Sequence, residues 1–304
     1  MKIIEFDYKN ATKCPDDLAL CLGFFDAIHL GHQAIIKAAK ETNLKVGVLT
    51  FDEPPMYVLK KRTSQLAITS TADKAEFFED LGVDYLYILH FDMEVADLSR
   101  YEFIDYVLKK IDPKILFCGE DYSFGKDGEG NPTYLSNYFK VKALDFVMDN
   151  GEKISSRKIT QLIKEGNVKE VSRLINRPYR LCGMVRHGNG NGKKLGFPTA
   201  NIDLDYPYIT PKEGVYMGFG IYNNVRYKAI ITFGTHPTII PLAKPIIEIH
   251  FIDFDKTIYG EYIFIEFVDY MRENMRFINT DELIKQLKKD EQKAKKVLKL
   301  SENE

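Results

Sequence analysis

The sequence contains no tryptophan and only four cysteines among its 304 residues. Cys14, Cys21, Cys118 and Cys182 form neither a CxxC pair nor a zinc-site pattern with histidines. No apolar run approaches the ~18 residues of a membrane-spanning helix, and the start MKIIEFDYKN lacks the apolar core of a signal peptide. These absences argue against a disulfide framework, a zinc site and a membrane protein. They predict reduced thiols in a cytoplasmic protein.

An excess of positive charge is also missing. The 42 Lys and Arg residues face 44 Asp and Glu residues, which gives a formal net charge of -2. Without a global basic field, a nucleic-acid partner held by counterion release is not expected. The chain is 45% hydrophobic and 28% charged, which is ordinary for a globular protein with a packed core. At roughly 100–200 residues per domain, the length suggests two domains.

Short apolar runs alternate with helical patterns up to about residue 150, as in a parallel sheet covered by helices. We expect strands at 18–22, 45–51, 85–89, 115–118 and 145–148. Ser99 and Glu102 have capping-box spacing and open a predicted helix over 101–110 that Pro113 ends. After residue 150 the pattern predicts a connector of two short helices, with a break at Gly166 and Asn167.

The second half alternates at the two-residue period of strands, and turns rich in Gly, Asn and Pro separate the runs. The runs are 181–185, 214–222, 227–233, 246–252 and 261–268. We predict an antiparallel sheet or small barrel, then an amphipathic helix over 281–300 that Asn279 and Glu282 open. The expected domains are 1–178, which includes the connector, and 179–304.

One segment of the first domain, GFFDAIHLGH at 23–32, leaves the first predicted strand and enters a helix near Gly31. His29 and His32 therefore lie at a helix N-terminus, where backbone N–H groups and the helix dipole favour a phosphate. Two imidazoles there add donors that neutralise charge on a transferring phosphate. The alternative is that one histidine caps a turn and the other is a surface residue. Asp26 before the pair and Gly31 within it favour the phosphate site.

This H-x-G-H segment resembles nucleotidyltransferases that pass AMP or CMP from a nucleoside triphosphate to an acceptor phosphate. LFCGEDYSFGKDGEGN at 116–131 is similar to the Gly-x-Asp-Phe-x-Phe-Gly motif of the bacterial FAD synthetase module, and ISSRKIT at 154–160 to its Ile-Ser-Ser-Thr-x-Ile-Arg motif. The resemblance implies catalysis by His29 and His32, and flavin contacts from Asp121 and Phe124. It implies ATP contacts from Gly23, Phe24, Asp26, Gly31, Asn131, Ser155, Ser156 and Arg157.

Several positions depart from that pattern. Ala27 replaces a glycine, and its methyl group is acceptable only if the backbone there needs no positive φ. Glu53-Pro54-Pro55 replaces Pro-His-Pro, which removes a donor beside the phosphates. In the third motif Arg157 replaces Thr, and Thr160 replaces Arg. Either Arg157 reaches the phosphates from the same helix face, or it is solvated and part of the triphosphate clamp is lost.

In the second half, LCGMVRHGNGNGKKLGFPTANI at 181–202 resembles the riboflavin kinase signature, a basic Gly-rich loop followed by Leu-Gly-Phe-Pro-Thr-Ala-Asn. Residues 214–218 and 233–239 continue that pattern. Thr199 and Asn201 are hard oxygen groups that face the same way on an extended segment, which suits a Mg²⁺-nucleotide. A Gly-rich hairpin is the alternative. The resemblance implies ATP contacts from Gly188, Lys193, Thr199 and Asn201, the last two also as ligands of Mg²⁺.

Glu248 lies within an apolar predicted strand, where a carboxylate is costly unless it is exposed or used. Alternation alone accepts an outward-facing glutamate. The resemblance instead implies that Glu248 is the base that takes the proton of the ribityl 5′-hydroxyl. FVDYMRENMRF at 267–277 is similar to a segment near the flavin, with Asn274 in place of Glu. It implies flavin contacts from Arg272 and Phe277, although both equally suit packing of the last helix.

Together the motifs span about residues 15–280 in the order of the prokaryotic bifunctional riboflavin kinase/FAD synthetase family. The resemblance implies a Rossmann-like nucleotidyltransferase α/β domain, then an antiparallel six-stranded β-barrel with a terminal helix. It implies phosphorylation of riboflavin to FMN and adenylylation of FMN to FAD, each with ATP and Mg²⁺.

Two alternatives stay open. One is a riboflavin kinase whose N-terminal module has drifted, and the other is a flavin-sensing regulator. Thr199, Asn201 and Glu248 argue against pure binding, because a sensor needs no base. The sequence leaves the oligomeric state open, a homo-oligomer included.

Overall fold

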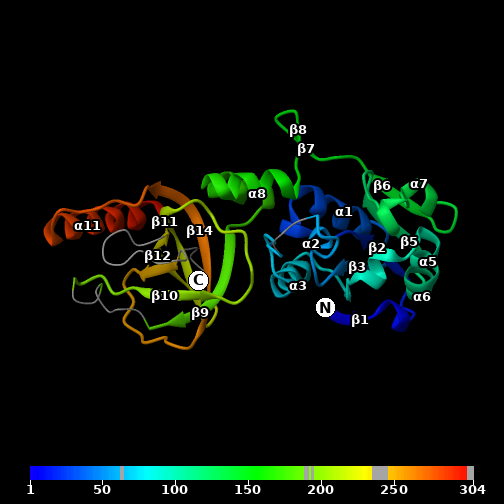
Figure 1. The fold of residues 1–304 in the computed structure, drawn as a ribbon, viewed down its shortest axis with the longest axis horizontal. Helices are drawn as coiled ribbons and strands as arrows, with labels where there is room; N and C mark the ends of the chain where they lie inside the picture. Colours follow the sequence, from blue (N-terminus) through cyan, green and yellow to red (C-terminus); the bar gives the residue numbers. More distant parts are fainter. Residues whose placement is uncertain (62–64, 188–191, 193–194, 235–245, 300–304) are drawn as a thin grey trace. The chain divides into compact units, whose positions relative to one another are not determined.

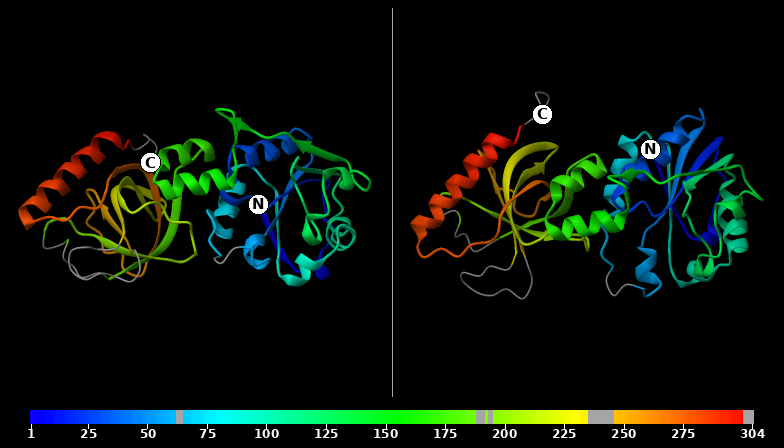
Figure 2. Two further views of the ribbon diagram at one scale, coloured as in Figure 1. Left: turned by 45° about the horizontal axis from the view of Figure 1, so that its top comes forward. Right: turned by 90° about the horizontal axis from the view of Figure 1, so that it is seen from above.

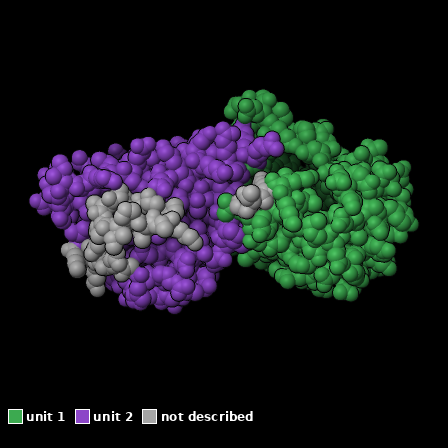
Figure 3. Space-filling model, in the orientation of Figure 1, with its two compact units in different colours: residues 1–156 green, residues 157–304 purple. Residues whose placement is uncertain are grey.

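The computed structural model describes residues 1–61, 65–187, 192, 195–234 and 246–299. The chain forms two compact units, and the boundary between them falls between Ser156 and Arg157 (Figure 3). The first unit is built on a parallel sheet and the second on a closed barrel (Figure 1).

The first unit contains a six-stranded parallel sheet in the order β1-β4-β3-β2-β5-β6. Its strands are β1 (Lys2–Phe6), β2 (Leu18–Leu22), β3 (Lys45–Phe51), β4 (Tyr85–Leu89), β5 (Ile115–Gly119) and β6 (Val141–Leu144). The strand order reverses between β2 and β5, and in such sheets ligands bind in the crevice at the carboxyl ends of the strands flanking this point. The expected strands at β2, β3, β4 and β5 are confirmed.

The strand expected at 145–148 is wrong, because the last strand of the sheet, β6, ends at Leu144, and only Met148 of that run lies in a strand, the separate β7 (Met148–Asp149). β6 is an edge strand without a buried residue, so no apolar run marks it in the sequence. β1 at the opposite edge was missed for the same reason: none of its residues is buried.

Helices cover both faces of this sheet (Figures 1 and 2). On one face lie α1 (Leu30–Lys40) and α3 (Thr71–Asp80), and on the other α4 (Met93–Asp97), α5 (Arg100–Phe103) and α6 (Lys109–Ile111). A π-helical turn over Ile104–Leu108 joins α5 to α6. The predicted capping box is present: Ser99 Oγ accepts the N–H of Glu102 at 3.2 Å, and Glu102 Oε2 accepts the N–H of Ser99 at 2.9 Å. Two short helices, α2 (Pro55–Val58) and α7 (Pro132–Leu135), lie in the connections.

In the second unit six antiparallel strands close into a barrel in the order β10-β13-β12-β11-β14-β9. They are β9 (Tyr179–Arg186), β10 (Ala200–Leu204), β11 (Gly214–Tyr222), β12 (Val225–Gly234), β13 (Ile246–Phe251) and β14 (Tyr262–Arg272). The predicted barrel is confirmed. β10 was not among the predicted runs, because Ile202 is its only buried residue.

The helical connector consists of α8 (Ser156–Glu165) and α9 (Val168–Ile175), with the predicted break at Gly166, whose φ is 79°. We expected it to belong to a first domain that ends at residue 178. Contacts instead group residues 157–178 with the barrel. The reason is that the apolar side of α9, which includes Val171 and Leu174, is buried and α9 packs on β9 and β14.

The last helix, α11 (Thr280–Val297), begins after Asn279, whose Oδ1 accepts the N–H of Glu282 at 2.9 Å as predicted. Ala294 of this helix packs in a common apolar cluster with residues of β11 and β12. An ion pair fixes the helix to the end of β14: Nη2 of Arg272 lies 2.7 Å from Oδ2 of Asp290, and Nε lies 3.0 Å from the same atom. The Asp290 side chain is only 5% exposed.

All four cysteines are free. Burial raises the pKa of the Cys118 thiol to about 12. No described helix has the length and apolar character needed to cross a membrane.

The Arg272–Asp290 pair predicts a stability effect. Asp290→Ala leaves a largely buried guanidinium without its partner, so we expect the free energy of unfolding of the barrel to fall by about 3 kcal/mol. As a control, Glu291→Ala removes the more exposed ion pair of the same helix with Lys295. It should cost less than about 0.5 kcal/mol. Urea denaturation followed by circular dichroism measures both, and equal losses would contradict the assignment.

Candidate active site

A cavity of about 240 Å³ lies at the carboxyl ends of β2, β5 and β6, where the strand order reverses. A small hairpin of β7 (Met148–Asp149) and β8 (Glu152–Lys153), with the residues around it, completes the wall. The cavity brings together seven of the predicted site residues, which are Gly23, His29, Gly31, His32, Asp121, Ser155 and Ser156.

The two histidines lie at the start of α1. His29 is the N-cap residue, and its Nδ1 accepts the backbone N–H of His32 at 3.4 Å. The two rings stack with centroids 3.7 Å apart. A Cβ at Gly31 would lie 3.1 Å from the His29 ring, so glycine leaves room for this arrangement.

Electrostatics keep His29 neutral. Burial lowers its pKa to about 4, and the positive charge of Lys153 adds to the effect. Because Nδ1 accepts a hydrogen bond, the proton of the neutral ring is assigned to Nε2, which remains available as a donor. The site thus offers a neutral imidazole donor at a helix N-terminus, a place that favours phosphate.

Asp26 is not among the described residues that line the cavity, but it organises the turn before the histidines. Its Oδ1 accepts four hydrogen bonds at 2.9–3.2 Å, from the N–H groups of Ala27, Ile68 and Thr69 and from the Thr69 hydroxyl. Its carbonyl oxygen accepts the hydroxyl of Ser156 at 2.8 Å. Burial raises the pKa of Asp26, whereas the charge of Lys74 and the donors favour the carboxylate. Asp26 therefore links the first and third motifs.

The turn itself is left-handed at Phe25, Ala27 and Ile28, with φ of 55°, 71° and 45°. The backbone at Ala27 therefore does need a positive φ, so the methyl group of alanine is not accommodated there without cost. A side chain in this region costs roughly 1–2 kcal/mol, which glycine avoids. The N–H of Ala27 donates to Thr69 Oγ1 at 3.1 Å and to Asp26, which holds the strained conformation.

Phe24, which is also a predicted ATP contact, lies against a buried lysine. Nζ of Lys74 in α3 is 3.6 Å from the centroid of the Phe24 ring, and Lys74 is 1% exposed. Burial lowers the pKa of Lys74 to about 8, while the charges of Asp26 and Asp52 oppose the shift. Sequence reasoning missed Lys74 because a lysine in an amphipathic helix is ordinarily solvated.

The second motif divides between the cavity and the core. Asp121 lines the cavity and forms an ion pair with Lys153. Phe124 is 7% exposed and packs in the core cluster between the sheet and its helices. Asn131 caps α7, where its Oδ1 accepts the N–H of Tyr134 at 2.9 Å. Neither Phe124 nor Asn131 is among the described residues that line the cavity, so their ligand contacts stay predictions.

The third motif also divides between the cavity and its surroundings, and the two positions that depart from the family pattern are not among the described lining residues. Ser155 and Ser156 line it, whereas Arg157 is exposed and, like Thr160, is not among its described lining residues. Other described residues line the cavity that were not predicted as site residues, and Tyr122, Phe146 and Lys153 are among them. Glu53, from the segment that replaces Pro-His-Pro, accepts a hydrogen bond from Gln65 at 2.6 Å.

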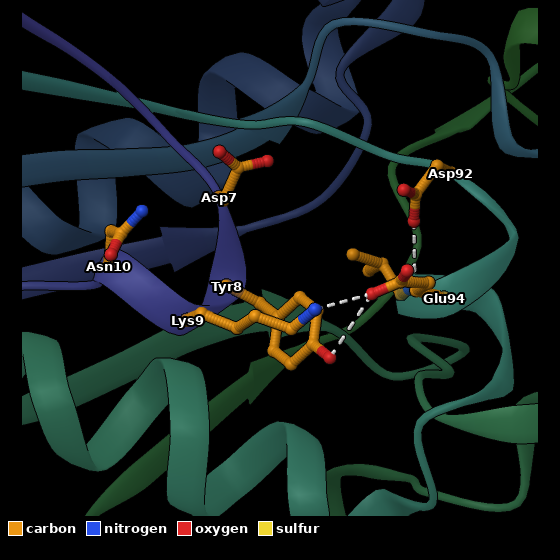
Figure 4. Close-up of a pocket in the computed structure, with 7 residues that line it drawn as sticks. Asp7, Tyr8, Lys9, Asn10, Asp92 and Glu94 are labelled. Carbon is orange, nitrogen blue, oxygen red and sulfur yellow. Dashed lines mark hydrogen bonds and ion pairs between the residues drawn. The ribbon is translucent and has the colours of Figure 1, made fainter.

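A second cavity, of about 290 Å³, lies where β1 and β4 end (Figure 4). Polar side chains of its lining are engaged within the protein. Lys9 Nζ lies 2.7 Å from Glu94 Oε2, and Asp92 caps α4 by accepting the backbone N–H of Val95 at 2.9 Å. None of the predicted site residues is among its described lining, and we assign it no role.

In the barrel, strand pairing brings Glu248 beside Asn201. Glu248 of β13 lies opposite Asn201 of β10 on one side and Thr232 of β12 on the other. Ile247 and Ile249 are buried, so by alternation these three polar residues share the opposite face of the sheet. The Pro198 carbonyl next to Thr199 accepts Nδ1–H of His250 at 2.8 Å, which ties this segment to β13.

Gly188 and Lys193 of the predicted phosphate loop, and residues 235–239 of the riboflavin kinase pattern, lie outside the described residues. Gly192 is described, and its carbonyl accepts the N–H of Phe197 at 2.9 Å. A Cβ at Gly192 would lie 2.4 Å from the Phe197 carbonyl oxygen, so this close approach requires glycine.

The predicted flavin segment lies after β14. Arg272 pairs with Asp290 of α11, which favours the helix-packing alternative. Asn274 donates to the carbonyl of Phe233 at 3.0 Å and so holds the end of β12. Phe277 belongs to the chain segment that connects β14 to α11, and its side chain is half-buried. The flavin contacts of Arg272 and Phe277 stay predictions.

A Rossmann-like sheet with two histidines at a helix N-terminus beside its cavity, followed by a closed six-stranded barrel, is the architecture of a nucleotidyltransferase fused to a flavokinase. The family model of FAD synthetase matches residues 11–158, and that of riboflavin kinase matches residues 175–298. The chain belongs to the bifunctional riboflavin kinase/FMN adenylyltransferase family. The predicted fold class and family are thereby confirmed.

The similarity extends over nine-tenths or more of the length of the relatives compared. The chain is 38% identical over 303 residues to the bifunctional riboflavin kinase/FMN adenylyltransferase of Listeria monocytogenes, with 96% of each chain covered. It is 34% identical to that of Bacillus subtilis, with 90% of each covered. A crystal structure from Streptococcus pneumoniae, of a chain described as a macrolide-efflux protein, is 33% identical with a TM-score of 0.89 and covers 97% of this chain and 99% of that one.

The strained turn predicts that Ala27→Gly stabilises the protein. Removing the methyl group relieves the left-handed strain but adds freedom to the unfolded chain, so we expect a net gain of about 0.5–1 kcal/mol. The control is Ala34→Gly within α1, which should lose about 1 kcal/mol. Urea denaturation of both variants measures the difference. A loss of stability in Ala27→Gly would contradict the strain.

The buried His29 predicts a pH dependence of stability. Between pH 6.5 and about 4 the unfolded chain binds a proton at His29 that the folded chain does not, so the free energy of unfolding falls as the pH falls. The loss should reach about 2 kcal/mol at pH 5 and be absent above the unfolded pKa. His29→Gln lacks this titration and should lose correspondingly less between pH 7.5 and 5. Parallel losses in urea denaturation of the two proteins would refute the burial of a neutral His29.

Proposed function

We propose that the barrel phosphorylates riboflavin with ATP to form FMN, and that the first unit then transfers AMP from a second ATP to FMN. The products of the second step are FAD and pyrophosphate. The observation that carries this conclusion is the presence of both family matches in one chain, each over the unit that holds the corresponding motifs. The four free cysteines suit the reducing cytoplasm, where we propose that the enzyme acts.

In the kinase step the 5′-hydroxyl oxygen of riboflavin attacks the γ-phosphorus of ATP. A new P–O bond forms, the bond from the γ-phosphorus to ADP breaks, and the hydroxyl proton goes to a base. We assign that base to Glu248, a half-buried carboxylate beside Asn201 on one face of the barrel wall. Positioning of the hydroxyl and of the triphosphate supplies most of the remaining catalysis.

The residues beside Glu248 fit a magnesium ion. Thr199 offers a hydroxyl and Asn201 an amide oxygen, which are hard ligands of the kind that Mg²⁺ prefers. Among the described residues no group of three His, Cys, Asp or Glu side chains forms a metal site. We therefore propose that few protein ligands and the phosphates of ATP share the ion, as is usual for Mg²⁺-nucleotides. Bound there, Mg²⁺ supplies positive charge against the transferring phosphate.

In the adenylyltransferase step a phosphate oxygen of FMN attacks the α-phosphorus of ATP. The bond from the α-phosphorus to the bridging oxygen breaks, and pyrophosphate leaves. No base is needed, because the FMN phosphate is already ionised. We propose that Nε2–H of the neutral His29 and the ring of His32 donate to phosphate oxygens as charge develops.

A riboflavin kinase with a drifted first module is the competing candidate, and the strain at Ala27 together with the loss of an arginine at Thr160 favours it. The intact cavity with its paired histidines favours the full pathway. Incubation of the protein with riboflavin, ATP and Mg²⁺, followed by chromatography of the flavins, decides between them. FAD supports both activities, FMN alone supports the drifted module, and unchanged riboflavin supports the regulator.

Single substitutions should separate the two activities. Glu248→Gln should abolish FMN formation yet leave conversion of supplied FMN to FAD nearly intact, because an amide cannot accept the proton. His29→Ala and His32→Ala should each lower FAD formation by at least ~10²-fold, the scale of one lost transition-state donor, while FMN still forms. Unchanged FMN formation in Glu248→Gln would remove Glu248 as the base, and wild-type FAD rates in both histidine variants would remove the histidines.

A further inference from the structure

Neither of the two proposed reactions assigns a role to the lysine that lines the cavity. Lys153 ends β8 and lines the cavity beside His29. Its Nζ lies 3.5 Å from the centroid of the Phe146 ring and forms an ion pair with Oδ2 of Asp121, and both neighbours line the same cavity. An aromatic face and a carboxylate therefore hold the ammonium group at the cavity wall.

Lys153 is also the only lysine or arginine among the described residues that line this cavity. The histidine beside it adds no charge, because burial holds His29 neutral. A triphosphate carries several negative charges, and a charged donor binds its oxygen atoms more strongly than a neutral donor does. The Arg157 side chain that could have supplied one is exposed and is not among the described lining residues.

We propose that Lys153 binds the phosphates of ATP during adenylyl transfer, and that it exchanges its ion pair with Asp121 for one with phosphate oxygens. The inference rests on the proposed adenylyltransferase function. The Lys153 side chain is 35% exposed and that of Asp121 is 60% exposed, so their ion pair is weakly held and can open. Phe146 keeps the ammonium group in place while the partner changes.

The test separates phosphate binding from support of the fold. Lys153→Met and Lys153→Arg are made in the full chain, with Lys142→Met as the control, because Lys142 of β6 is exposed and is not among the described lining residues. FAD formation from FMN and ATP is measured with pyrophosphate and with adenosine as inhibitors. Pyrophosphate reports on the phosphate contacts alone. Adenosine has no phosphate group, so it reports on the nucleoside contacts.

In Lys153→Met we expect kcat/KM for ATP to fall ~10²-fold. The inhibition constant of pyrophosphate should rise at least ~10-fold, and that of adenosine should not change. Lys153→Arg should stay close to wild type, as should Lys142→Met. FMN formation by the barrel should be unaffected, and the unchanged inhibition constant of adenosine serves as the folding control of the first unit.

Three results would overturn the inference. The first is an unchanged inhibition constant of pyrophosphate in Lys153→Met. The second is an equal rise of the inhibition constants of pyrophosphate and adenosine in that variant. The third is a rise of the pyrophosphate inhibition constant that appears only in Arg157→Ala. If the wild-type protein makes no FAD, the adenylyltransferase function itself fails. Calorimetric titration with pyrophosphate then still tests Lys153, because Lys153→Met must lose a binding site that Lys142→Met keeps.

Discussion

The carboxylate of Asp26 is the constraint on which the first unit depends. Four hydrogen bonds converge on one of its oxygen atoms, and its own carbonyl receives the hydroxyl of Ser156. Because the carboxylate is buried, each of these hydrogen bonds is stronger than it would be in water. They force the backbone between β2 and α1 into left-handed conformations that alanine and isoleucine ordinarily avoid. The turn that leads into α1 and its two histidines is thus held by one side chain that is not among the described lining residues of the cavity.

The buried strands of the fold could be predicted from the sequence, and the edge strands could not. β2 and β4 are buried at every position and so appear as continuous apolar runs. β1 and β6 contain no buried residue, and their strand conformation comes from pairing with neighbours rather than from their own composition. The connector shows the same limit: the periodicity of α9 reveals an apolar side, but only the structure shows that β9 and β14 cover it.

The site was predictable where a residue type is unusual in its local pattern. Two histidines at a helix start and a glutamate in an apolar strand stand out in this way. Lys74 and Lys153 do not, because lysine is common on surfaces and its burial or its position beside a cavity depends on segments distant in sequence. Phe124 and Asn131 belong to a recognisable motif, yet one packs in the core and the other caps a helix, so their ligand contacts stay predictions.

The register of β13 has a consequence for how this protein can evolve. Asn201, Glu248 and Thr232 lie side by side only because three strands of a closed barrel are held in one register. Deleting or inserting a single residue in β13 would turn Glu248 into the apolar interior and expose isoleucines instead. Changes of length should therefore survive selection in the connecting segments and be purged from the strands. Point substitutions that keep the alternation of buried apolar and outward-facing polar residues along a strand should be tolerated, because they leave the register unchanged.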